Sequence, residues 1–111
     1  MRLSKSVTDH IENNPTDTFV SIASLWEISI KTSIGKLPLN TSLESIINDF
    51  IYADGLKILA IQPKHVLKVM NLPLHHKDPF DRILAAQVLV DGLSFATRDP
   101  LFDSYGIQRF W

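Results

Sequence analysis

The chain has 111 residues, 45% of them hydrophobic and 21% charged, with a formal net charge of −1 and no cysteine. These values are typical of one globular domain in a reducing compartment, and they exclude disulfides, thiolate metal sites and a broadly basic nucleic-acid-binding surface. No apolar run reaches the roughly 20 residues that cross a bilayer, so we expect a cytoplasmic protein, free of the membrane, with one domain over residues 1–111.

Short strands alternate with amphipathic helices along the chain. In order, the patterns predict a helix from Ser4 to about Asn13, a strand at 19–22, a helix from Ser24 to Gly35, a helix from the capping box at 41–44 to just before Gly55, a strand at 57–61, a short helix from Pro63, a helix from Asp78 to Gly92, and strands at 93–97 and 107–111. This alternation is typical of an α/β domain with a mainly parallel sheet.

The apolar stripes of the helices are assigned to the core. Trp26 and the isoleucines that follow it at every fourth residue form one such stripe. Val66, Leu67 and Met70 are expected to point inward from the short helix that begins at Pro63.

The segment 76–82, His-Lys-Asp-Pro-Phe-Asp-Arg, places two carboxylates where a helix begins. Asp78 is expected to cap that helix and Pro79 to be its first residue, which leaves Asp81 as an acid that the cap does not need. A second acidic turn, Thr-Arg-Asp-Pro at 97–100, follows the next strand. Acids that recur at the ends of separate elements suggest a cation site.

Each acid also has an ordinary structural role. Glu27 can complete a capping box with Ser24 or pair with Lys31, and Asp99 can stabilise a turn before a proline. As a set, however, Glu27, Asp81 and Asp99 are hard oxygen ligands of the kind that suit Mg²⁺ or Mn²⁺. In phosphodiester hydrolysis such a cation neutralises phosphate charge and generates or orients hydroxide.

Basic side chains near these acids are candidates for contacts with substrate phosphate. The candidates are Lys77, Arg82 and Arg98. Arg82 has an alternative role, since Asp78 lies four residues before it on the same helix face. His75 and His76 are adjacent, whereas helical ligand pairs lie three or four residues apart, so we expect both to be solvated loop residues.

Three stretches of the chain resemble the acidic motifs of the PIN-domain ribonucleases, specifically the VapC-like toxins of bacterial type II toxin–antitoxin systems. The stretches are 20–28 with Glu27 as the acid, 72–87 with Asp81, and 96–106 with Asp99. The resemblance runs over essentially the whole chain. It implies a three-layer α/β/α domain in which these acids hold Mg²⁺ or Mn²⁺ for catalysis.

The same resemblance implies endonucleolytic cleavage of RNA, with tRNA among the expected substrates. It implies a cognate antitoxin that blocks the active site. It also implies that the chain forms a homodimer. Ser24, Thr97 and Asp103 correspond to supporting residues around the three acids.

The chain departs from the family pattern at its start. Family members begin with an apolar strand that ends in an aspartate, whereas residues 1–4 resemble the stretch that follows this strand and its helix. We therefore expect an N-terminally truncated PIN domain without the family's first acid.

Two functions remain open: a metal-dependent ribonuclease toxin, or a catalytically inactive PIN domain that acts only through antitoxin binding or self-association. A phosphoacceptor domain is a weaker alternative, because its chemistry needs a lysine after a late strand, where this chain has Arg98 and Asp99.

Overall fold

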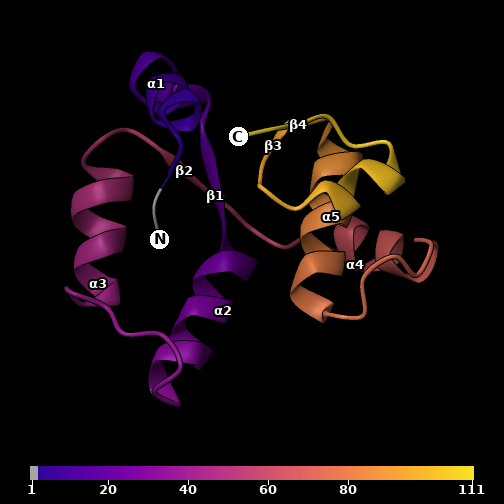
Figure 1. Cartoon of the computed structure of the whole chain (residues 1–111), viewed down its shortest axis with the longest axis horizontal. Coiled ribbons are helices and arrows are strands. Elements are labelled where there is room, and N and C mark those ends of the chain that lie inside the picture. The colour runs from indigo at the N-terminus through magenta and orange to yellow at the C-terminus, as the bar shows by residue number, and fades with distance from the viewer. Residues whose placement is uncertain (1–2) are drawn as a thin grey trace. The chain divides into compact units, whose positions relative to one another are not determined.

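A computed structural model describes residues 3–111 (Figure 1). The chain divides into two compact units. The first, here called the 11–60 unit, is continuous in sequence, and the second, called the 61–111 unit, also includes the residues up to His10. Helix α1 (Lys5–Asn13) begins as predicted, because the Val7 N–H donates to the Ser4 hydroxyl at 3.2 Å.

The 11–60 unit is built around two parallel strands. Its elements are η1 (Pro15–Asp17), β1 (Phe19–Ser21), α2 (Ile22–Ser33), α3 (Leu43–Ser45), the π-helix η2 (Ile46–Tyr52) and β2 (Lys57–Leu59). Strands β1 and β2 pair in parallel, with Phe19 opposite Lys57. Leu25, Ile51 and Leu56 form the buried core of this unit.

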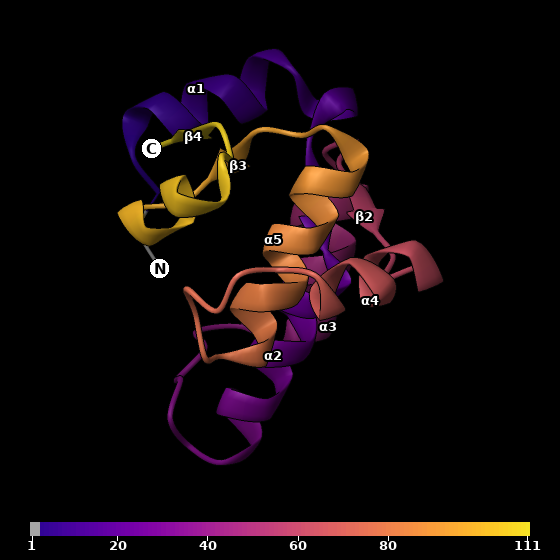
Figure 2. The same cartoon turned by 90° about the vertical axis from the view of Figure 1, so that its right-hand side faces the viewer.

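The 61–111 unit contains two helices that pack on each other and a second parallel pair of strands. Its elements are α4 (Pro63–Met70), α5 (Pro79–Asp91), β3 (Phe95–Ala96), the 3₁₀ helix η3 (Pro100–Tyr105) and β4 (Arg109–Phe110). Helices α4 and α5 lie side by side (Figure 2). The core contains Leu72, Ala85, Ala86, Val88, Phe102 and Ile107. Because β3 and β4 are also parallel, the predicted α/β class with parallel strands is confirmed.

Two predicted helix starts are wrong. The cap of α2 is Ser21, whose hydroxyl accepts the Ala23 N–H at 3.1 Å, so Ser24 lies inside the helix. Strand β1 therefore passes into α2 without a loop, and its last residue serves as the cap. Similarly, Ser42 rather than Thr41 caps α3.

The predicted inward face of α4 is also wrong. Val66, Leu67 and Met70 are 54%, 61% and 80% exposed, whereas His65 is completely buried and Val69 packs against the core. The reason is that His65 finds a polar partner inside the unit, which turns the other side of the helix inward.

The stripe that starts at Trp26 does not enter the core. Trp26, Ile30 and Ile34 are all exposed, at 57%, 37% and 58%. Helix α2 instead contributes Ala23 and Leu25 to the buried residues, because this side of the helix faces η2 and the strands.

Candidate active site

The start of α5 has the predicted geometry. The Asp78 carboxylate accepts the N–H groups of Phe80 and Asp81 at 2.8 and 3.1 Å, and Pro79 is the first helical residue. The cap is therefore confirmed at Asp78. Asp81 lies in the first turn, where a carboxylate interacts favourably with the helix dipole.

The guanidinium of Arg82 is used within the fold. It donates to the carbonyl oxygens of Val69, Leu72 and Pro73 at 3.0, 3.4 and 3.2 Å. The alternative ion pair with Asp78 does not form. Arg82 thus ties the end of α4 and the following loop to the first turn of α5, and its contact with phosphate stays a prediction.

Asp99 follows β3 and caps η3. Its Oδ1 accepts the Leu101 N–H at 2.9 Å, and its own N–H donates to the Thr97 hydroxyl at 3.2 Å. The side chain is 43% exposed. The carboxylate is therefore fixed by the backbone on one side and open to solvent on the other.

His76 corrects the prediction of a solvated loop residue. The ring is buried, lies 4.3 Å from the Phe102 ring and stacks on Tyr105 with an interplanar angle of 10°. Its Nε2 is 2.9 Å from the Asp99 Oδ2. His75, in contrast, is exposed as predicted.

The tautomer of the neutral His76 ring follows from its partners. An ionised Asp99 only accepts hydrogen bonds, so Nε2 must carry the hydrogen. The Tyr105 hydroxyl accepts the His76 backbone N–H at 3.1 Å and donates its own hydrogen to Nδ1 at 3.0 Å. A directed chain of hydrogen bonds thus runs from Tyr105 through His76 to Asp99.

These donors change the acidity of Asp99. The hydrogen bond from His76, followed by the one from the Leu101 N–H, lowers the pKa of this carboxyl below its ordinary value. Asp99 is therefore held in the ionised form, which is the form that binds cations.

The remaining predicted site residues of the 61–111 unit are Asp103, Arg98 and Lys77. Asp103 forms a two-point ion pair with Arg109 of β4, at 3.0 and 3.1 Å, which lowers the pKa of the aspartate and raises that of the arginine. Arg98 lies over the Trp111 ring at 5.9 Å. Lys77 is exposed at the start of the motif.

Glu27 belongs to the 11–60 unit and forms the predicted pair with Lys31, at 2.7 Å. The capping box with Ser24 is excluded, because the cap lies three residues earlier. Among residues 3–111, no three His, Asp or Glu side chains gather closely enough to hold a metal ion. The convergence of Glu27 with Asp81 and Asp99 stays a prediction.

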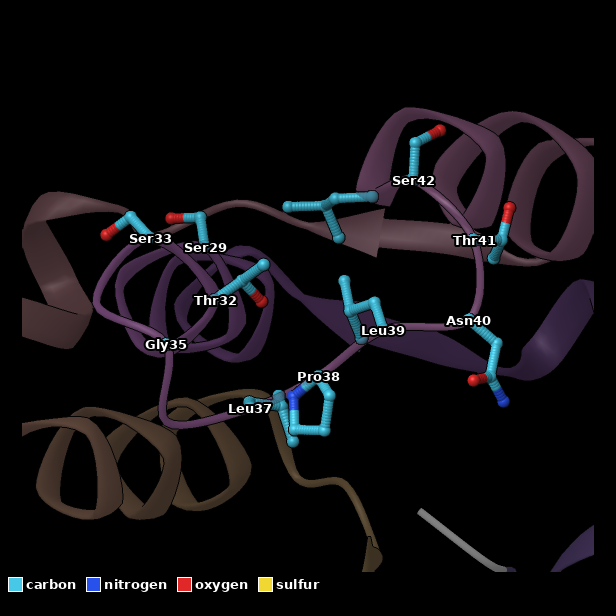
Figure 3. A pocket seen from close by; sticks show the side chains of 11 residues that line it. Ser29, Thr32, Ser33, Gly35, Leu37, Pro38, Leu39, Asn40, Thr41 and Ser42 are labelled. Carbon is cyan, nitrogen blue, oxygen red and sulfur yellow. The ribbon is translucent and has the colours of Figure 1, made fainter.

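The 11–60 unit also contains an open pocket of about 790 Å³, between the end of α2 and the segment before α3 (Figure 3). Its polar groups are mainly hydroxyls, from Ser29, Thr32, Ser33, Thr41 and Ser42. None of the residues that line it is ionisable. The pocket therefore offers hydrogen bonds but no acid, base or cation ligand for hydrolysis.

The described residues contain no helix with the length and apolar character of a membrane span.

Comparison with known proteins identifies the family. No curated protein and no solved structure matches the chain. The family model of the PIN domain, however, matches residues 3–108, which contain every motif acid discussed above. The chain belongs to the PIN-domain family.

Proposed function

We propose that this PIN domain is a metal-dependent endoribonuclease that hydrolyses RNA phosphodiester bonds, with tRNA as a candidate substrate. PIN domains are typically metal-dependent nucleases. The observation that carries the proposal is the Asp99 carboxylate, which is ionised, partly exposed and oriented by His76 and the Leu101 N–H.

The carboxylate chemistry of the proposed ligands suits Mg²⁺ or Mn²⁺. Asp99 has two oxygens, each accepting one hydrogen bond, so each keeps a lone pair for a hard cation. Asp81 and Glu27 would supply the other carboxylates. The bound ion would neutralise charge on the phosphate and orient or ionise the attacking water.

We propose that basic side chains of the motifs contact the phosphate of the substrate. Lys77 precedes the cap of α5, and Arg98 precedes Asp99 in sequence. Arg82 is the weaker of the three candidates, because its donors already serve carbonyl oxygens. The residues that would support the three acids around the cation are Ser24, Thr97 and Asp103.

The biological role we propose is that of a VapC-like toxin in the cytoplasm, active as a homodimer and neutralised by a cognate antitoxin. The alternative is an inactive PIN domain that acts only by binding the antitoxin or a second copy. The resemblance of residues 20–28, 72–87 and 96–106 to the toxin motifs supports the choice of this subfamily.

The test is cleavage of RNA by the purified chain with Mn²⁺ or Mg²⁺, with and without EDTA. We expect EDTA to abolish cleavage and Asp81→Asn or Asp99→Asn to reduce the rate at least about 100-fold, in the range found when key catalytic groups are removed. Asp9→Asn, on an exposed position of α1, is the control and should retain full activity.

Cleavage that survives EDTA or both substitutions would contradict the metal mechanism. An inactive wild-type chain that still co-purifies with the protein encoded by the adjacent gene would support the non-catalytic alternative. Circular dichroism of each variant separates lost chemistry from lost folding.

A further inference from the structure

We propose that His76 is a positioning residue, which is held by Tyr105 and sets the orientation of the Asp99 carboxylate for a divalent cation. This inference rests on the proposed function, since it assigns Asp99 to the cation. It gives a role at the site to His76 and Tyr105, which are not among the three predicted acids.

The ring of His76 has one allowed orientation. Nδ1 and the backbone N–H both bond to the Tyr105 hydroxyl, at 3.0 and 3.1 Å, and Nε2 reaches Asp99 at 2.9 Å. A flip of the ring would place carbon atoms where both nitrogens now have partners. The Phe102 and Tyr105 rings, which both lie against the imidazole, also restrict its plane.

A purely structural role does not require this arrangement. A buried imidazole is costly unless both nitrogens are bonded, and an apolar side chain would fill the same space next to Phe102 without that requirement. The ring instead directs its N–H to an acid that is 43% exposed. Carboxylate ligands of metals are commonly oriented by such a hydrogen bond.

The 61–111 unit contains a second histidine–aspartate pair, whose role is structural. His65 also donates from Nε2 to an aspartate, Asp91, at 2.9 Å. Asp91 is only 17% exposed and forms a salt bridge with Lys64 at 3.0 Å, so its charge is already neutralised inside the fold. Among the described residues Asp99 has no direct salt bridge to a lysine or arginine, and Arg109, which acts on it at longer range, is itself ion-paired with Asp103, so the Asp99 carboxylate keeps room for an external cation.

The experiment measures Mn²⁺ affinity of the full chain by electron paramagnetic resonance of the free ion. We expect His76→Leu to weaken binding by about 10- to 100-fold, the usual cost of removing a partner of a metal ligand. His76→Gln, whose amide can still donate, should recover part of the affinity. Tyr105→Phe, which keeps the aromatic ring, should cause a smaller loss than His76→Leu.

A double-mutant cycle shows whether the effect passes through Asp99. In an Asp99→Asn background, His76→Leu should cause no further loss of Mn²⁺ affinity. His65→Gln is the matched control, because it alters the other His–Asp pair and should leave the affinity unchanged. Circular dichroism verifies that each variant is folded at the temperature of the measurement.

The outcomes separate this inference from the proposed function. If the wild-type chain binds Mn²⁺ and Asp99→Asn binds it more weakly, while folded His76→Leu keeps its affinity, the positioning role is wrong and the proposed function stands. If the wild-type chain binds no Mn²⁺ and cleaves no RNA, the proposed function fails and this inference with it.

Discussion

His65 shows how one residue determines the packing of a helix. Its Nδ1 accepts the Gln62 N–H at 2.9 Å, which closes a capping box at the start of α4. Because Nδ1 is the acceptor, Nε2 carries the hydrogen and donates it to Asp91, the last residue of α5. A single imidazole therefore caps one helix and ties it to the end of another.

The pKa of Asp91 leads to a prediction about pH. The hydrogen bond from Lys64 and, after it, that from His65 lower this pKa below its ordinary value of 3.8, although burial opposes them. A carboxyl group with a lowered pKa stabilises the fold at pH values above its ordinary pKa. This stability is lost as the pH falls through the lowered pKa. Asp91→Asn should therefore reduce the free energy of unfolding by about 1–3 kcal/mol near neutral pH.

Urea unfolding of the wild type and Asp91→Asn, followed by circular dichroism from neutral pH down to below the ordinary carboxyl pKa, measures this difference. It should shrink as Asp91 of the wild type becomes protonated. A difference that stays constant with pH would show that packing, rather than the charge of Asp91, sets the cost. Asp9→Asn serves as a control for the general effect of removing one surface charge.

At the scale of elements, α5 and α4 are joined by Arg82. The guanidinium donates to three carbonyl oxygens at the end of α4 and in the next loop, where helical carbonyls lack partners of their own. A lysine has one ammonium group and cannot reproduce this planar, multiple donation.

Arg82→Lys is therefore expected to destabilise the protein by about 1–3 kcal/mol, because charge-assisted hydrogen bonds to carbonyl oxygens, two of them partly buried, are lost. Hydrogen exchange should become faster in the last turn of α4. If Arg82→Lys instead preserves stability and lowers only the rate of RNA cleavage, the side chain serves the substrate rather than the fold. Lys77→Arg is a suitable comparison, since Lys77 is exposed.

Local signals explain which elements were predictable. The start of α5 follows from Asp78 and Pro79, and its end from Gly92, which adopts a φ of +65°. These residues act on their immediate neighbours. The buried face of α4 does not follow from local signals, because it depends on Asp91, 26 residues after His65.

The same reasoning applies to the candidate site. Asp81 stands out in the sequence because Asp78 already caps the helix, and Asp99 stands out because it follows a predicted strand directly. His76 gave no such signal, since its partners Asp99 and Tyr105 lie 23 and 29 residues away. Its neighbour His75 is exposed, and nothing in the local pattern distinguishes the two.

At the scale of the whole molecule, two short parallel pairs lie in separate units. The strands of the first pair have three residues each and those of the second have two. Isolated two-stranded sheets are marginal in water, so the helices that pack on them provide most of the stability. The motif acids are distributed over both units, with Glu27 in one and Asp81 and Asp99 in the other.

This distribution makes thermal unfolding a test of the predicted acidic set. An ion that binds only the folded chain stabilises it by about 2.7 kcal/mol when its concentration is 100 times the Kd. Mn²⁺ should therefore raise the Tm of the wild type, and Glu27→Gln and Asp81→Asn should each reduce the shift. Lys31→Gln removes the Glu27 ion pair but keeps the carboxylate, so it should leave the shift unchanged.

A shift that Glu27→Gln leaves intact would remove Glu27 from the predicted set and confine the cation to the 61–111 unit. A shift lost in Lys31→Gln as well would show that the ion pair, rather than the carboxylate as a ligand, is responsible.

The contrast between two adjacent histidines provides a chemical reporter of the folded state. Diethyl pyrocarbonate acylates accessible, unprotonated imidazole nitrogens. His75 is exposed, whereas His76 is buried against the Phe102 and Tyr105 rings and has a hydrogen-bond partner on each nitrogen. Mass spectrometry of the labelled peptide should therefore find one acylated histidine in the folded protein and two after unfolding, so a single fragment records whether residues 76, 99 and 105 are assembled.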